Sequence, residues 1–113
     1  MKTDTVLLFT HNGMGHAPQE LQLALAKKFL TLTLQSQQLP ARILFYTEGV
    51  QLACQGSPVL DELKQLQDLG VELVLCQTCL KFLNLEDSVL VGIVGGMGDI
   101  LESLQASPKV ISL

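Results

Sequence analysis

The chain has 113 residues, a formal net charge of −4 and a hydrophobic content of 48%. This length fits one domain, and we assign residues 1–113 to it. The sequence contains no basic stripe that would neutralise phosphates, which excludes nucleic acid as a partner. The N-terminal apolar run is too short for a secretory signal, and no apolar run is long enough for a membrane helix. Three cysteines, an odd number, do not fit a secreted disulfide framework, so we expect a cytoplasmic protein.

Strand and helix patterns alternate along the first half of the chain. Residues 5–10 are apolar and rich in β-branched and aromatic side chains, which is typical of a strand buried on both faces. A loop with two glycines and Pro18 follows, and residues 19–38 have the apolar spacing of a helix. Residues 41–47 predict a second strand, and residues 48–52 predict a short helix.

The second half continues this alternation. Its predicted elements are a helix at 57–69, a strand at 71–75, a short helix at 77–83, a strand within 89–94, a helix at 99–105 and a strand at 109–113. Ser57 is expected to cap the first of these helices, and Asp99 with Glu102 resembles a capping box for the last. The order predicts a single-domain α/β fold, with a mostly parallel five-stranded sheet and helices on both faces.

The unusual residues of the chain follow the predicted strands. In an open parallel sheet, ligands bind beyond the carboxyl ends of the strands, so these residues should gather at one edge. The expected substrate-binding residues are Asn12, Met14, Gly15 and His16 after the first strand, Cys54 after the second, and Gly95, Gly96 and Met97 after the fourth. The glycine spacing matches neither a dinucleotide fingerprint nor a Walker motif, so we expect no cofactor.

Cys76 and Cys79 form the sharpest motif, a CxxC where the third strand gives way to a helix. The amino end of a helix stabilises negative charge, which would lower the pKa of a thiol placed there. A thiolate is the nucleophile in disulfide exchange and in accepting sulfur as a persulfide. We therefore predict that both cysteines are catalytic. The alternative is that they are small buried side chains.

Metal binding is a weaker interpretation of the same residues. A structural zinc site needs four ligands, and the chain has no second CxxC, so we expect no metal. His11 and His16 are the groups that ordinarily titrate near neutral pH. Each is interpreted either as an aid to a thiolate or as an exposed loop histidine.

The segment from Gly70 to Leu85 resembles the DsrE/DsrF-like sulfur-relay family. It is most similar to the DsrE-like domain of YedF proteins, which are linked to selenium metabolism and have a turn like Cys76-Gln77-Thr78-Cys79-Leu80. Weaker matches are Met14-Gly15 with Glu20-Leu21, and the run Cys54-Gln55-Gly56-Ser57. The resemblance covers nearly the whole chain, and the cysteine turn is its specific part.

The resemblance implies a flavodoxin-like fold and a persulfide carried on Cys76, with Cys79 as a second thiol that assists. It also implies sulfur donor and acceptor proteins, such as a cysteine desulfurase or a TusA-like protein, and a homo-oligomer, either a trimer or a hexamer. YedF proteins usually have an N-terminal TusA-like domain. Since this chain starts at the first strand, its sulfur or selenium donor is expected to be separate.

Two other functions remain open from the sequence. The chain is either a thiol-disulfide redox protein that uses Cys76 and Cys79, or a non-enzymatic module that binds a small ligand or a partner protein. A thioredoxin-type CxxC follows the first strand, whereas this pair follows the third, which favours the sulfur-relay interpretation.

Overall fold

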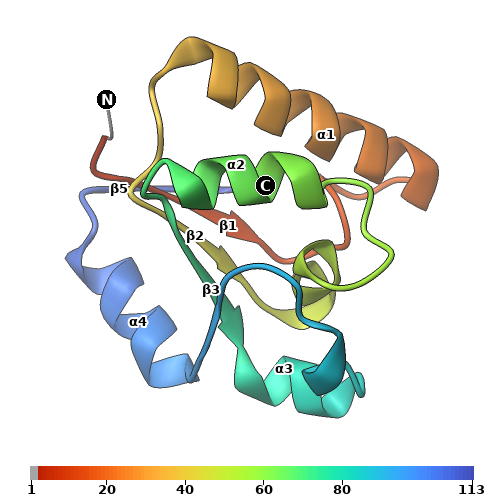
Figure 1. Cartoon of the computed structure of the whole chain (residues 1–113). Helices are drawn as coiled ribbons and strands as arrows, with labels where there is room; N and C mark the ends of the chain where they lie inside the picture. The colour runs from red at the N-terminus through yellow and green to blue at the C-terminus, as the bar shows by residue number, and fades with distance from the viewer. Residues whose placement is uncertain (1–2) are drawn as a thin grey trace.

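The computed structural model describes residues 3–113, which form five strands, four α-helices and two 3₁₀ helices (Figure 1). The strands are β1 (Thr5–Phe9), β2 (Arg42–Phe45), β3 (Glu72–Cys76), β4 (Ile93–Gly95) and β5 (Lys109–Ser112). The helices are α1 (Gln19–Ser36), α2 (Leu60–Asp68), α3 (Gln77–Phe82) and α4 (Met97–Ala106), with the 3₁₀ helices η1 (Thr47–Ala53) and η2 (Glu86–Ser88).

All five strands are parallel and form one sheet in the order β4-β3-β2-β1-β5. Helices α1 and α2 pack together over one face of the sheet, and α4 packs on the other side against β3 and β4 (Figure 1). This arrangement follows from right-handed crossovers, because the chain moves first toward β4 and then returns to β5. The predicted α/β class with helices on both faces is confirmed.

The core consists mainly of aliphatic side chains from the three central strands. Ile43, Leu44 and Phe45 are fully buried, as expected for a strand with a helix layer on each face. Phe45 stacks on Phe9 of the neighbouring strand, with ring centroids 5.7 Å apart. The apolar runs that predicted strands are thus explained by burial on both faces.

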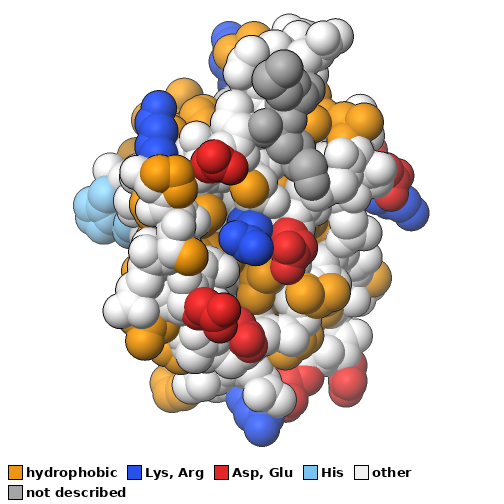
Figure 2. Space-filling view, turned by 90° about the vertical axis from the view of Figure 1, so that its left-hand side faces the viewer, with side chains coloured by type: hydrophobic (Ala, Val, Ile, Leu, Met, Phe, Trp, Pro, Cys, Tyr) orange, Lys and Arg blue, Asp and Glu red, His pale blue; other side chains and the backbone are white. Residues whose placement is uncertain are grey.

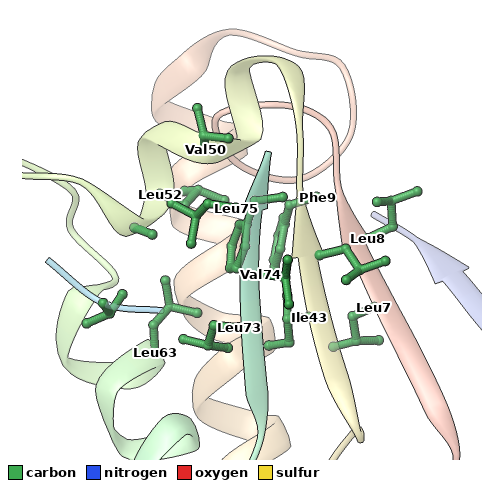
Figure 3. Packing of buried hydrophobic residues seen from close by; sticks show 14 of the residues in the cluster. Leu7, Leu8, Phe9, Ile43, Val50, Leu52, Leu63, Leu73, Val74 and Leu75 are labelled. Carbon is green, nitrogen blue, oxygen red and sulfur yellow. The ribbon is translucent and has the colours of Figure 1, made fainter. Parts of the chain in front are cut away.

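The 3₁₀ helix η1 covers the carboxyl end of this core. Its Val50 and Leu52 are fully buried and belong to the core cluster, and Leu52 lies beside Leu75 of β3 (Figure 3). This packing brings the segment after β2 next to the segment after β3. The first residues of η1 therefore lie beside the CxxC.

Two predicted helix starts and one strand differ from the structure. Helix α4 begins at Met97, and Asp99 lies in its first turn, where its Oδ2 accepts a hydrogen bond from the Gly96 N–H at 2.9 Å. The capping box predicted from Asp99 was therefore placed too late. Likewise, Ser57 precedes the start of α2 and accepts from the Val59 N–H instead.

The fourth strand is shorter and later than predicted, because its pairing with β3 begins only at Ile93.

Hydrophobic side chains are also exposed on the surface. Figure 2 shows the side of the molecule that carries α4, where hydrophobic atoms lie between charged side chains. Ile93, Val94, Met97 and Leu101 of β4 and α4 are each at least half exposed. Among residues 3–113, no helix combines the length and the apolar composition needed to cross a bilayer.

Candidate functional site

The two cysteines of the CxxC lie in different environments. Cys76 is the last residue of β3, pairs with Gly95 of β4 and is fully buried. Cys79 is the third residue of α3, one turn further along, and is only partly buried. The next residue, Leu80, is buried and anchors this six-residue helix on the core. The same strand–helix junction therefore contains one fully buried thiol, Cys76, and one partly exposed thiol, Cys79.

Thr47 contacts Cys79 from the neighbouring segment. Its backbone N–H donates a hydrogen bond to Cys79 Sγ at 3.0 Å. Thr47 has a φ of 49°, a left-handed conformation that is rare for a β-branched residue and costs about 1–3 kcal/mol. Its hydroxyl shares its one proton between the carbonyl oxygens of Thr10 and Tyr46, and this three-centre hydrogen bond holds the conformation. The chain thus maintains a strained residue at the point where its N–H meets the thiol.

Cys79 opens onto a pocket of about 480 Å³ between η1 and α3. The lining residues are Thr47, Glu48, Gln51, Thr78, Cys79, Phe82 and Leu83. Phe82 is 86% exposed at its rim. Cys76 does not line this pocket, so a molecule in the pocket meets Cys79 first.

The expectation of a lowered thiol pKa is wrong for Cys79. Burial raises the pKa of Cys79, and the Thr47 N–H opposes this by stabilising the thiolate. The neighbouring Cys76 thiol raises this pKa further. Helix α3 has only six residues, so the contribution expected from its amino end does not dominate. At neutral pH, Cys79 therefore contains less thiolate than an ordinary exposed cysteine.

Asn12 and Cys54 lie in a second, smaller pocket. Its volume is about 300 Å³, and Gln51 lies between it and the Cys79 pocket because it lines both. Asn12 Nδ2 donates to Gln51 Oε1 at 3.1 Å. Cys54 is almost fully buried, its Sγ donates to the Val50 carbonyl at 3.2 Å, and burial raises its pKa. These two predicted residues thus lie outside the Cys79 pocket, and Gln51 connects the two pockets.

Met14, Gly15 and His16 belong to the loop before α1 and line neither pocket. The loop is tied to α1 through Gln22, whose carbonyl accepts from the Met14 N–H and whose Nε2 donates to the Gly15 carbonyl at 2.7 Å. His16 is exposed, and its ring centroid is 6.2 Å from that of His11. The structure therefore ties Met14 and Gly15 to α1, places His16 at the surface and does not bring these three residues to the Cys79 pocket.

Gly95, Gly96 and Met97 connect β4 to α4. Gly95 lies opposite Cys76 in the sheet register, but none of the three lines the Cys79 pocket. The Gly96 N–H is already bonded to the Asp99 carboxylate, so it is not free to hold an anionic ligand. Within residues 3–113, no group of three or more His, Cys, Asp or Glu side chains is arranged to hold a metal ion.

The sequence analysis did not select Thr47, Gln51 or Phe82 as site residues. Thr47 looked like the end of a strand, and a β-branched side chain gives no sign of a positive φ. Gln51 lies in the short helix predicted at residues 48–52, and a lone glutamine carries no motif that marks it as a site residue. Phe82 follows the CxxC by three residues, a spacing that puts it on the same side of a helix as Cys79.

A model of the DsrE/DsrF-like family matches residues 4–113, so the chain belongs to this family. Membership suggests a function related to sulfur relay. No curated protein matches the chain significantly.

Similar solved structures share the fold. A protein of unknown function from Methanobacterium thermoautotrophicum has a TM-score of 0.70 and 17% identity, with 96% of this chain and 97% of that chain covered. The ychN protein from E. coli has a TM-score of 0.68 and 18% identity, with 96% and 97% covered. A conserved protein of unknown function from Bacteroides thetaiotaomicron has a TM-score of 0.69 and 16% identity, with 97% and 95% covered.

Proposed function

We propose that the protein is a sulfur carrier that holds a persulfide on Cys76 and passes the sulfur to a partner protein. The observation that supports this most is the pair of adjacent free thiols, one closed and one open to a pocket, in a chain of the DsrE/DsrF-like family. Burial of Cys76 suits storage, because a persulfide kept away from water and free thiols is not lost between partners. All three cysteines are free, which fits a reducing compartment.

The proposal predicts a sulfur increment that depends on Cys76. The reduced protein is incubated with cysteine persulfide, chased with free cysteine to remove exposed persulfides, and weighed intact by mass spectrometry. The wild type should keep one added sulfur atom through the chase. Cys76→Ser should lose it, because the buried position that protects the sulfur is gone.

The matched control for this experiment is Cys54→Ser. Cys54 is buried like Cys76 but is bonded to the Val50 carbonyl, outside the thiol pair. The Cys54→Ser variant should keep the added sulfur through the chase as the wild type does. A wild-type protein that gains no sulfur, or a Cys76→Ser variant that keeps as much added sulfur through the chase as the wild type, would contradict the proposal.

The thiol-disulfide alternative has a different signature. A redox protein would convert Cys76 and Cys79 to a disulfide, with loss of two hydrogen atoms and no added sulfur. Both cysteines are free thiols and lie three residues apart at the same strand–helix junction, which suits either function. The same mass measurement therefore separates the two functions.

The partners implied by this function are a sulfur donor and a sulfur acceptor, with a cysteine desulfurase and a TusA-like protein as the first to test. Selenium is a second cargo, since a donor that carries selenium in place of the outer sulfur of a persulfide can pass it to a thiol by the same exchange. Co-purification of a cysteine desulfurase or a TusA-like protein with the wild type would support this assignment. Transfer of sulfur from the persulfide of that donor to Cys76 or Cys79 would support it further.

We also expect the chain to associate with itself through β4 and α4. Strand β4 ends the sheet and is in contact with α4, and both elements carry exposed apolar side chains, Ile93 and Val94 on β4 and Met97 and Leu101 on α4. Exposed apolar groups beside an unpaired strand edge favour contact with a second copy. The double variant Ile93→Lys with Leu101→Lys should have the mass of one chain by light scattering. The wild type should have a mass that is a multiple of this value.

A matched control for this variant lies on the opposite face. Gln35→Lys with Gln65→Lys adds the same charge to exposed positions of α1 and α2 and should leave the mass unchanged. A wild type that is monomeric at micromolar concentration would contradict self-association.

A further inference from the structure

We infer that sulfur enters the pair through Cys79, and that Thr47 is the residue that positions this thiol. The inference rests on the proposed function and specifies the order in which the two cysteines act. It departs from the resemblance, which implies that Cys76 meets the sulfur donor and Cys79 only assists.

Accessibility decides the order. Cys76 is fully buried at the end of β3, whereas Cys79 lines the pocket between η1 and α3. An incoming persulfide must bring its outer sulfur atom into contact with the attacking thiolate. Of the two cysteines, Cys79 offers that contact in this structure, and Cys76 lies three residues earlier at the same strand–helix junction, where it is close enough to affect the pKa of Cys79.

The transfer then takes two exchanges that balance without an oxidant or a reductant. The Cys79 thiolate attacks the outer sulfur of the donor persulfide, an S–S bond forms on Cys79, and the donor leaves as a thiolate that takes a proton. The Cys76 thiolate next attacks the outer sulfur of the Cys79 persulfide. The sulfur moves to Cys76 and Cys79 returns to a thiol, and release to an acceptor reverses this route.

Thr47 controls the first exchange through its backbone. Its N–H is 3.0 Å from Cys79 Sγ and stabilises the negative charge that the attack requires. The left-handed conformation that aims this N–H depends on the hydroxyl bonds to Thr10 and Tyr46. The titratable groups around Cys79 are the Cys76 thiol and the Glu48 carboxylate, and neither supplies positive charge. The amide of Thr47 is therefore the group that favours the thiolate.

Sulfur uptake before any chase tests the order of the thiols. The initial rate of sulfur gain from cysteine persulfide is measured by intact mass, and fragment ions between Cys76 and Cys79 locate the sulfur. Cys79→Ser should gain sulfur at least about tenfold more slowly than the wild type, because a buried thiol reacts only when the structure opens locally. Cys76→Ser should gain sulfur on Cys79 no more slowly than the wild type, because the thiol that raises the pKa of Cys79 is gone, and should lose it in the chase.

The outcomes separate this inference from the proposed function. Rapid and stable sulfur gain by Cys79→Ser would overturn entry through Cys79 and leave the carrier function standing. Failure of Cys76→Ser to gain sulfur before the chase would also overturn it. If the wild type itself gains none, the carrier function is wrong.

Two Thr47 variants test the positioning role. Thr47→Val keeps the β-branched shape and loses the hydroxyl, whereas Thr47→Ser keeps the hydroxyl. Iodoacetamide alkylation of Cys79 should be about tenfold slower at neutral pH in Thr47→Val, with its pH profile moved to higher pH, because a hydrogen bond to the thiolate is lost. Thr47→Ser should restore the wild-type profile.

Thermal unfolding of both variants checks that they are folded when they are compared. A loss of stability alone would expose Cys79 and speed alkylation, which is the opposite of the expected change. An unchanged pH profile in folded Thr47→Val would overturn the role of Thr47.

Discussion

Phe45→Ala is expected to lower the free energy of unfolding by about 3–5 kcal/mol. Phe45 lies in the central strand β2, is fully buried and stacks on Phe9 with a centroid distance of 5.7 Å. Its removal leaves a cavity between the sheet and the helix layer, and the core of this chain has few aromatic side chains with which to fill it. A domain of this size has a stability of about 5–15 kcal/mol, so the loss is a large part of the total. Urea unfolding followed by circular dichroism measures it.

Phe82→Ala is the matched control for this prediction. It makes the same chemical change at a side chain that is 86% exposed, so the free energy of unfolding should change by less than about 0.5 kcal/mol. Equal losses in the two variants would mean that Phe82 is covered in solution. A small loss in Phe45→Ala would contradict the packing described here.

Gly49→Ala is expected to cost about 3 kcal/mol and to disturb the thiol site at the same time. An added Cβ at position 49 would lie 2.2 Å from the carbonyl oxygen of Phe9 and 2.7 Å from its carbonyl carbon. The backbone of β1 lies in the core and cannot yield, so η1 must move away from it. Because η1 begins with Thr47, the N–H that meets Cys79 moves as well. Urea unfolding gives the stability, and the pH profile of Cys79 alkylation gives the effect on the site.

Gly98→Ala is the control for the substitution itself. A Cβ there meets nothing within 4 Å, and the residue lies in helix α4 with an ordinary φ. Alanine in a helix is more favourable than glycine, so this variant should be unchanged or more stable by up to about 1 kcal/mol. If Gly49→Ala behaves as Gly98→Ala does, the close packing of η1 on β1 is wrong.

The predicted site and the observed site differ in which residues lie together. The residues after the strands do lie toward one end of the sheet, but Cys79 and the η1 residues Thr47 and Gln51 gather in one pocket, and Asn12 and Cys54 lie in the next. The loop around His16 is turned toward α1 by Gln22 and stays apart. Side-chain direction and loop packing decide these groupings, and neither has a periodic signal in a single sequence.

The sequence by itself determined the α/β class, the parallel sheet and the position of the CxxC at the end of β3. Apolar runs and their spacing depend on local geometry, since a strand buried on both faces must be apolar throughout and a helix must repeat its apolar residues every three to four positions. Only the tertiary structure decided that Cys76 is closed, that Cys79 opens onto a pocket and that its pKa is raised. Those properties depend on η1, a segment about thirty residues earlier in the chain, which covers the core and places the amide of Thr47 against the sulfur of Cys79.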